Sequence, residues 1–160
     1  MTRSLWKPLG AAALAAAAVA ALGAAATDLG PWYQNLQKPS WQPPDWLFGP
    51  AWILIYALCA LSAATAWSAT SDRVNRTRIL GLFALNALLN VLWSESFFGQ
   101  HRPDWALIEV VPFWLSIVLL IVALAPISRR ASLLLLPYLA WVTFASILNL
   151  AIVRLNPPPG

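Results

Sequence analysis

Residues 47–69 read LFGPAWILIYALCALSAATAWSA, a stretch that contains no charged side chain. A helix that crosses the hydrocarbon layer of a bilayer needs about 20 mostly apolar residues, far more than a buried strand. Four similar runs, bounded by charged residues, proline or glycine, lie elsewhere in the chain. We therefore predict an all-α membrane protein, a single domain over residues 1–160, with five transmembrane helices at approximately 9–26, 47–69, 79–98, 105–125 and 131–153.

The composition agrees with a membrane protein. Of the 160 residues, 60% are hydrophobic and 10% are charged, whereas soluble domains carry roughly 25% charged residues. The net charge of +4 comes from basic residues in short connections and not from a basic face with interleaved aromatic residues, so nucleic-acid binding is not expected. The single cysteine, Cys59, excludes an intrachain disulfide, and we expect a small buried apolar side chain there.

The first apolar run has two interpretations. Arg3 and Lys7 followed by alanines are also typical of a secretory signal peptide, which would be removed. The run is longer than the roughly 7 to 15 apolar residues of such a peptide. Its alanines also recur every fourth residue, at Ala12, Ala16, Ala20 and Ala24. A smooth stripe of this kind lets membrane helices approach closely, so we expect a retained helix that packs against a neighbouring helix or a second protomer.

Basic residues predict the orientation in the membrane, because the side richer in Lys and Arg faces the cytoplasm. One side carries Arg3, Lys7, Arg73, Arg76, Arg78, Arg129 and Arg130. The other side carries only Lys38, Arg102 and Arg154. We therefore expect a cytoplasmic N-terminus and an outer first loop over residues 27–46. Pro39, Pro43 and Pro44 would hold this loop in extended conformations that exclude helix.

Aromatic and amide side chains gather toward the outer ends of the predicted helices. Most of the ten tryptophans suit a membrane interface, but Trp52, Trp93, Trp114 and Trp141 lie deeper. Residues at helical spacing share a face. The resulting stripes are Trp52 and Tyr56; Asn86, Asn90, Trp93 and Phe97; Trp105, Glu109 and Phe113; and Trp141, Ala145 and Asn149. We therefore predict an aromatic cavity with a few polar groups in the outer half of the bundle.

The polar members of these stripes also have a structural interpretation. Asn86 and Asn90 are the kind of side chain that joins membrane helices by hydrogen bonds. Glu95 and Glu109 are costly to place in hydrocarbon and are therefore functional candidates. Glu95, however, lies close enough to the outer end to reach headgroups or Arg102.

Two prolines are expected to bend helices. Pro112 and Pro137 fall inside the fourth and fifth predicted helices, where proline removes a backbone hydrogen bond and frees a carbonyl at Ile108 or Leu133. Such a kink can shape a cavity or can serve packing alone.

Several membrane chemistries lack the residues that they need. The only histidine, His101, lies in a loop, so no transmembrane haem ligand is available. Both lysines, Lys7 and Lys38, lie outside the helix interiors, which excludes a retinal-type Schiff base. No catalytic triad, phosphate loop or metal-ligand cluster is present, and we expect neither a metal nor a required cofactor. The function that remains is recognition of an apolar, flat molecule.

A dense motif points to one family. The first loop and second helix contain Trp32-Tyr33, Leu36, Lys38-Pro39, Trp41, Pro43-Pro44, Phe48-Gly49-Pro50 and Trp52. The later helices contain Asn90, Trp93, Phe97-Phe98, Trp105-Ala106, Glu109, Pro137-Tyr138-Leu139-Ala140-Trp141, Phe144-Ala145 and Leu148-Asn149. In residue type, order and spacing, residues 31–156 resemble the TspO/MBR family of tryptophan-rich sensory proteins and translocator proteins.

The resemblance implies a five-helix bundle, commonly homodimeric, that binds protoporphyrin IX and related tetrapyrroles, sterols, and isoquinoline or benzodiazepine ligands. We therefore expect a bacterial membrane protein that senses or carries porphyrin. The inner membrane is favoured over the outer membrane as its location. Taken together, spacing and resemblance predict a ligand-binding set of Tyr33, Trp41, Pro43, Trp52, Tyr56, Asn86, Asn90, Trp93, Trp105, Glu109, Trp141, Ala145 and Leu148. Lys38 and Arg102 would supply cations for the porphyrin propionates.

Two other functions stay open. Some bacterial relatives promote light-dependent oxidative breakdown of protoporphyrin, and the resemblance assigns that chemistry to Trp32 and Trp141. A structural or assembly factor without a ligand is the third alternative. The chain also departs from the family: Glu109 stands where many relatives have Asp, and Asn86 replaces a frequent Gln. The sterol-recognition pattern is incomplete, because Leu150 precedes Arg154 where that pattern requires Tyr.

Overall fold

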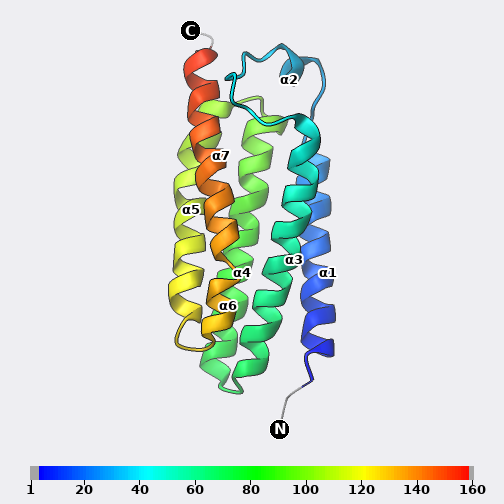
Figure 1. Cartoon of the computed structure of the whole chain (residues 1–160), viewed down its shortest axis with the longest axis vertical. Helices are drawn as coiled ribbons and strands as arrows, with labels where there is room; N and C mark the ends of the chain where they lie inside the picture. The colour runs from blue at the N-terminus through cyan, green and yellow to red at the C-terminus, as the bar shows by residue number, and fades with distance from the viewer. Residues whose placement is uncertain (1–3, 159–160) are drawn as a thin grey trace.

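The computed structural model describes residues 4–158 as a bundle of long helices (Figure 1). Its elements are α1 (Trp6–Ala26), α2 (Pro31–Asn35), α3 (Asp45–Ala69), α4 (Arg73–Ser94), the π-helical segment η1 (Glu95–Gly99), α5 (Pro103–Leu124), α6 (Arg129–Leu133) and α7 (Leu136–Leu155). Among the described residues, five segments are long and apolar enough to cross a membrane: Trp6–Ala26, Asp45–Ala69, Arg73–Gly99, Pro103–Leu124 and Arg129–Leu155. The predicted five-helix, all-α membrane fold is therefore confirmed.

One face of helix α5 contributes the largest set of buried residues. Its side chains Phe113, Ile117 and Leu120 are at most 1% exposed, and the helix packs against α4, α6 and α7. The outer surface is apolar instead, with Leu14 76% and Ile108 72% exposed. Exposing such a surface to water over a whole bundle would be unfavourable in free energy, whereas lipid chains cover it without this cost.

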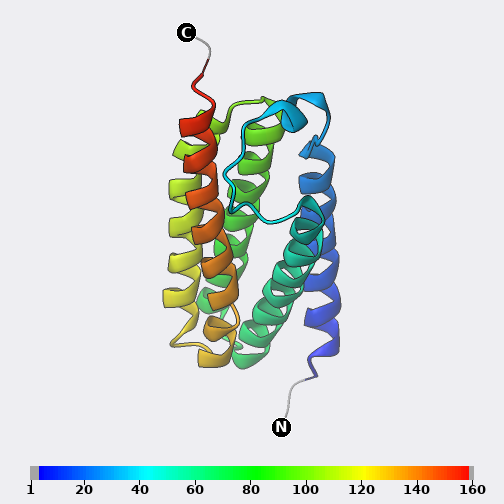
Figure 2. The ribbon, with the colours of Figure 1, turned by 45° about the horizontal axis from the view of Figure 1, so that its top comes forward.

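Helix α1 lies at the side of the bundle. It packs mainly against α3 and also contacts α4 and η1, and both views show it beside α3 (Figures 1 and 2). Gly23 is its one buried residue. The alanine-rich helix therefore packs against a neighbouring helix, whereas packing of its alanine stripe against a second protomer stays a prediction.

The two ends of the bundle differ in charge. The N-terminus and the α3–α4 and α5–α6 turns lie at one end, opposite the C-terminus and the long connection that contains α2 (Figure 1). This arrangement places Lys7, Arg73, Arg76, Arg78, Arg129 and Arg130 toward the first end, while Arg3 falls outside the described residues. Lys38, Arg102 and Arg154 belong to the other end, which we call the loop end.

The first loop is not wholly extended, so this part of the prediction is wrong. Residues Pro31–Asn35 form the short helix α2. Pro31 stands in its first turn, where the ring fixes a helical φ and the missing N–H costs nothing. The stretch that contains the three later prolines, residues 36–44, does lack helix.

Two further local predictions are corrected. Pro137 does not kink a helix, because the chain breaks between α6 and α7 and Pro137 occupies the first turn of α7. Glu95 does not pair with Arg102. Its carboxylate accepts a hydrogen bond from Gln100 Nε2 at 2.9 Å, while Arg102 forms a two-point ion pair with Asp104. The pair with Asp104 holds the pKa of the exposed Arg102 guanidinium above its usual value.

Candidate ligand-binding site

The site begins with a hollow beneath the first loop, bounded by α1, α3, α4, η1 and α7. We call it the loop-end cavity, and its volume is about 670 Å³. The side chains that line it include Thr27, Tyr33, Gln42, Asp45, Phe48, Trp52, Tyr56, Trp93, Phe97, Trp141 and Asn149. This volume falls within the range of sites that enclose small molecules.

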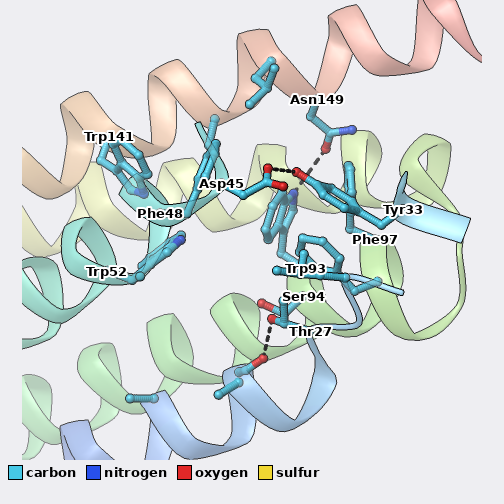
Figure 3. A pocket seen from close by; sticks show the side chains of 18 of the residues that line it. Thr27, Tyr33, Asp45, Phe48, Trp52, Trp93, Ser94, Phe97, Trp141 and Asn149 are labelled. Carbon is cyan, nitrogen blue, oxygen red and sulfur yellow. Dashed lines mark hydrogen bonds between the residues drawn. The ribbon is translucent and has the colours of Figure 1, made fainter. Parts of the chain in front are cut away.

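Aromatic rings form most of the cavity wall. Trp52, Trp93 and Trp141 project into it from α3, α4 and α7 (Figure 3). The ring centroids of Trp52 and Trp141 are 6.3 Å apart at 89°, and Trp93 stacks on Phe97 at 5.4 Å. Rings held by other rings keep fixed orientations, so their faces are presented to a ligand in advance.

A buried asparagine fixes one of these indoles. Asn149 is 1% exposed; its Oδ1 accepts a hydrogen bond from Trp93 Nε1 at 3.2 Å, and its Nδ2 donates to the carbonyl of Pro103 at 2.9 Å. Asn149 thus joins α7 to both α4 and α5. In contrast, Trp141 Nε1 and Gln42 Oε1 are buried without a hydrogen-bond partner among the described residues. Both belong to cavity-lining residues, and a ligand with polar atoms could satisfy them.

The first loop is tied down over the cavity. Tyr33 Oη donates a hydrogen bond to Asp45 Oδ1 at 2.9 Å and accepts one from Gln42 Nε2 at 3.2 Å. Lys38 Nζ donates to the Tyr33 carbonyl at 2.7 Å and lies 4.4 Å from the centroid of its ring. At the far side of the loop, Asn156 exchanges two hydrogen bonds with the backbone of residue 37, at 2.9 and 2.7 Å. The loop is therefore an ordered lid held by hydrogen bonds, not a flexible linker.

The Tyr33–Asp45 hydrogen bond should hold the lid closed. Burial, followed by the hydrogen bond to Asp45, raises the pKa of Tyr33 to about 12. Because the folded pKa lies above the unfolded value of about 10, this contribution to stability is complete below pH 10 and is lost as the pH rises through about 12. We expect Tyr33→Phe to speed amide hydrogen exchange in residues 36–44 roughly tenfold at neutral pH.

The control for this change is Gln34→Ala, because Gln34 is exposed and its side chain bonds only to the Leu29 carbonyl among the described residues. The pH dependence of tyrosinate absorbance is measured for the wild type and for Tyr33→Phe. The difference between the two curves gives the titration of the Tyr33 hydroxyl. A midpoint near pH 10, together with unchanged exchange, would contradict the closed lid.

The predicted site residues divide into two groups. Those that line the loop-end cavity are Tyr33, Trp52, Tyr56, Trp93, Trp141, Ala145 and Leu148. Those that do not are Trp32, Trp41, Pro43, Asn86, Asn90, Trp105 and Glu109. Lys38 and Arg102, the expected propionate partners, also lie outside the lining, and both are engaged by other groups of the protein.

Asn86 and Asn90 serve the packing of the bundle. The Tyr138 hydroxyl donates to Asn86 Oδ1 at 3.0 Å and accepts from Asn90 Nδ2 at 3.3 Å, while Asn86 Nδ2 donates to Ser116 Oγ at 2.9 Å. All four residues are buried. This network joins α4 to α5 and α7, as the structural interpretation of the two asparagines anticipated.

The outlying tryptophans have other neighbours. Trp32 stacks on His101 at 4.4 Å and meets the lining residue Phe97 edge-on at 6.1 Å, but it does not itself line the cavity. Trp105 is 50% exposed beneath the Arg102 guanidinium, which lies 4.2 Å from its ring centroid. Trp41 is similarly exposed and packs edge-on against Phe144.

Glu109 is placed away from the cavity as well. Both of its carboxylate oxygens are buried and have no hydrogen-bond partner among the described residues.

Trp114, one of the four deep tryptophans, donates to Thr143 Oγ1 at 2.8 Å and thereby joins α5 to α7. The α5 stripe therefore does not contribute to the lining of this cavity.

Comparisons of the sequence with known proteins agree with this architecture. The model of the TspO/MBR family matches residues 11–155. This chain belongs to the TspO/MBR family. It is 45% identical over 130 residues to the tryptophan-rich protein TspO of Chlorobaculum tepidum, covering 79% of this chain and 80% of that protein.

Other TspO/MBR relatives extend the similarity. The tryptophan-rich sensory protein of Cereibacter sphaeroides is 37% identical over 143 residues, which cover 86% of this chain and 88% of the relative. The human translocator protein is 35% identical over 126 residues, or 78% and 75% of the two chains. These relatives, together with the five apolar helices, identify the protein as a multi-pass integral membrane protein.

Sequence reasoning missed one wall of the cavity in this TspO/MBR bundle. Residues Ala20, Gly23, Ala24 and Thr27 line it from α1. The signal was present, since Ala20 and Ala24 belong to the alanine stripe that we assigned to packing alone. The lid residues Gln42 and Asp45 were also missed, because only the structure shows that they converge on Tyr33.

Proposed function

We propose that this protein binds a flat, apolar tetrapyrrole, of which protoporphyrin IX is the probe of choice, in the loop-end cavity and acts as a membrane sensor or carrier of porphyrin. The observation that carries the proposal is the lining: three indoles and three phenylalanines around about 670 Å³, beneath a closed lid. A porphyrin offers a broad π face for such rings. A purely structural bundle would gain more stability by filling this space than by leaving it open.

The polar groups of the cavity suit the edges of the macrocycle. Trp141 Nε1 is a buried donor and Gln42 Oε1 a buried acceptor, and both are unsatisfied. The loop-end rim offers Thr27 and Gln42 and no cationic side chain among its lining residues. Propionate groups would therefore rely on neutral donors or water at the rim, and Lys38 could reach them only by leaving the Tyr33 carbonyl. Sterols, isoquinolines and benzodiazepines would compete for the same apolar space.

Titration with protoporphyrin IX tests the proposal. In lipid nanodiscs, tryptophan emission should be quenched in a saturable way, with one porphyrin bound per chain, because several indoles line the cavity. Empty nanodiscs and a nanodisc-embedded helical protein without such a cavity measure the porphyrin that simply dissolves in lipid. Quenching that rises linearly, at the same slope as this partitioning, would contradict a specific site.

Light-driven oxidation of the porphyrin is the second candidate, and the position of one residue favours it. Trp141 lines the cavity and can donate an electron to a photoexcited macrocycle, with dissolved molecular oxygen as the oxidant that accepts electrons in the net reaction, whereas Trp32 does not line the cavity. If the chain has this activity, Trp141→Phe should slow loss of the porphyrin absorption band under illumination, and Trp32→Phe should change it little. Equal decay in wild type, Trp141→Phe and protein-free nanodiscs would exclude the enzymatic role.

A further inference from the structure

A second hollow lies on the same side of the bundle but toward its basic end. We call it the α1–α3–α4 groove, after the helices that bound it, and its volume is about 580 Å³. Helix α1 contributes Ala11, Ala12, Ala15 and Ala16, and α3 contributes Cys59. Tyr56 lines both this groove and the loop-end cavity, so its ring lies where the two spaces approach each other.

The mouth of the groove is cationic. Lys7, in the first turn of α1, is one of its lining residues. Trp67 of α3 also lines the groove, and the guanidinium of Arg76 lies 4.5 Å from the centroid of its ring, with Arg76 Nε donating to the Thr70 carbonyl at 3.1 Å. No aspartate or glutamate is among the described residues that line the groove. The acid at the nearby turn, Asp72, is engaged in capping α4 through the N–H of Asn75.

The inner end of the groove offers no comparable polar attraction. Asn86, Asn90 and Tyr138 line it, but their side chains are buried and bonded to one another in the network that joins the helices. The remaining wall consists of alanines and larger apolar side chains such as Phe83. A ligand for this space is therefore apolar along its length and negative at one end.

The charge at the groove mouth favours an anionic occupant. Lys7 and Arg76 are both cationic and belong to the basic end of the bundle. An anionic phospholipid of the adjacent leaflet has the opposite sign at that level and an acyl chain of the required character.

We propose that the α1–α3–α4 groove is a lipid site, in which an anionic phospholipid places its acyl chain along the alanine face of α1 and its phosphate between Lys7 and Arg76. The site is separate from the porphyrin cavity and independent of the proposed function. Lipid in the groove would support α1, which otherwise buries only Gly23.

Native mass spectrometry of the full chain tests this proposal. The protein in detergent is titrated with phosphatidylglycerol or phosphatidylcholine of identical acyl chains. We expect one phosphatidylglycerol to bind at least fivefold more tightly than phosphatidylcholine. The double change Lys7→Gln and Arg76→Gln should lower the affinity for phosphatidylglycerol to that for phosphatidylcholine, because each cation near the surface contributes roughly fivefold to the affinity for an anionic lipid. Arg130→Gln changes a cation at the same end but on α6, a helix that contributes no residue to the groove, and should keep the preference.

A second measurement uses the wild-type chain and places the lipid. Cys59 is the only cysteine and lines the groove, so its alkylation by a small apolar maleimide reports on occupancy. Phosphatidylglycerol should slow this reaction several-fold more than phosphatidylcholine. Equal effects of the two lipids on Cys59, or equal affinities in the wild type, would overturn the proposal, as would loss of the preference in Arg130→Gln.

Discussion

Replacing Trp52 and Trp141 together by leucine should weaken protoporphyrin binding about 30-fold. The two rings meet edge-on at 6.3 Å on adjacent walls of the loop-end cavity, so a flat ligand that enters it contacts both. Each indole contributes on the order of 1 kcal/mol of ring interaction beyond the apolar area that it covers, and two such losses amount to about 30-fold. Leucine keeps the wall apolar, so the fold should survive.

The affinity should be read from the absorption band of the porphyrin, because the variant itself lacks two of the reporting indoles. The matched control is the double change of Trp41 and Trp105 to leucine. These tryptophans are 48% and 50% exposed and lie outside the lining. The control should bind porphyrin as the wild type does. Equal losses in both double variants would mean that tryptophans matter through the membrane interface and not through the cavity.

Replacing Asn149 by leucine should destabilise the bundle by roughly 1–3 kcal/mol. The change leaves Trp93 Nε1 and the Pro103 carbonyl without their partner in a buried site, and such groups carry a desolvation cost. The thermal transition in detergent should fall by several degrees. Porphyrin affinity should fall as well, since Trp93 loses the hydrogen bond that orients its ring.

Ser146→Ala is the matched control for this change. Ser146 lies in the same helix, but its hydroxyl bonds only to the Val142 carbonyl of the preceding turn among the described residues. We expect its thermal transition to stay within about a degree of the wild type. An Asn149→Leu variant as stable as Ser146→Ala would show that the link between α4, α5 and α7 contributes little.

The sequence predicts the helices well because membrane spans have a strong local signature. Twenty apolar residues in a row have few alternatives, and each of the five expected runs corresponds to one of the five apolar membrane-spanning segments, although the last segment is divided into α6 and α7. Local chemistry also explains the corrections. Pro137 is tolerated equally inside a kinked helix and in a first turn, and only the packing of the chain around α6 decides between them.

The cavity is predicted less completely, because spacing places residues on a common face without fixing the direction of that face. Asn90 and Trp93 share one stripe of α4, yet Asn90 lies deeper and bonds to Tyr138, while Trp93 lines the cavity. Glu109 and Trp105 form an equally convincing stripe on α5. That helix stands behind α4 and α7, so neither side chain reaches the lining.

The structure of the protein with protoporphyrin IX bound is the most direct test of this account. We expect the macrocycle beneath the lid, in contact with Trp52, Trp93 and Trp141, with an edge group near Trp141 Nε1. A porphyrin bound on the lipid-facing surface or in the α1–α3–α4 groove, with the loop-end cavity left empty, would contradict it.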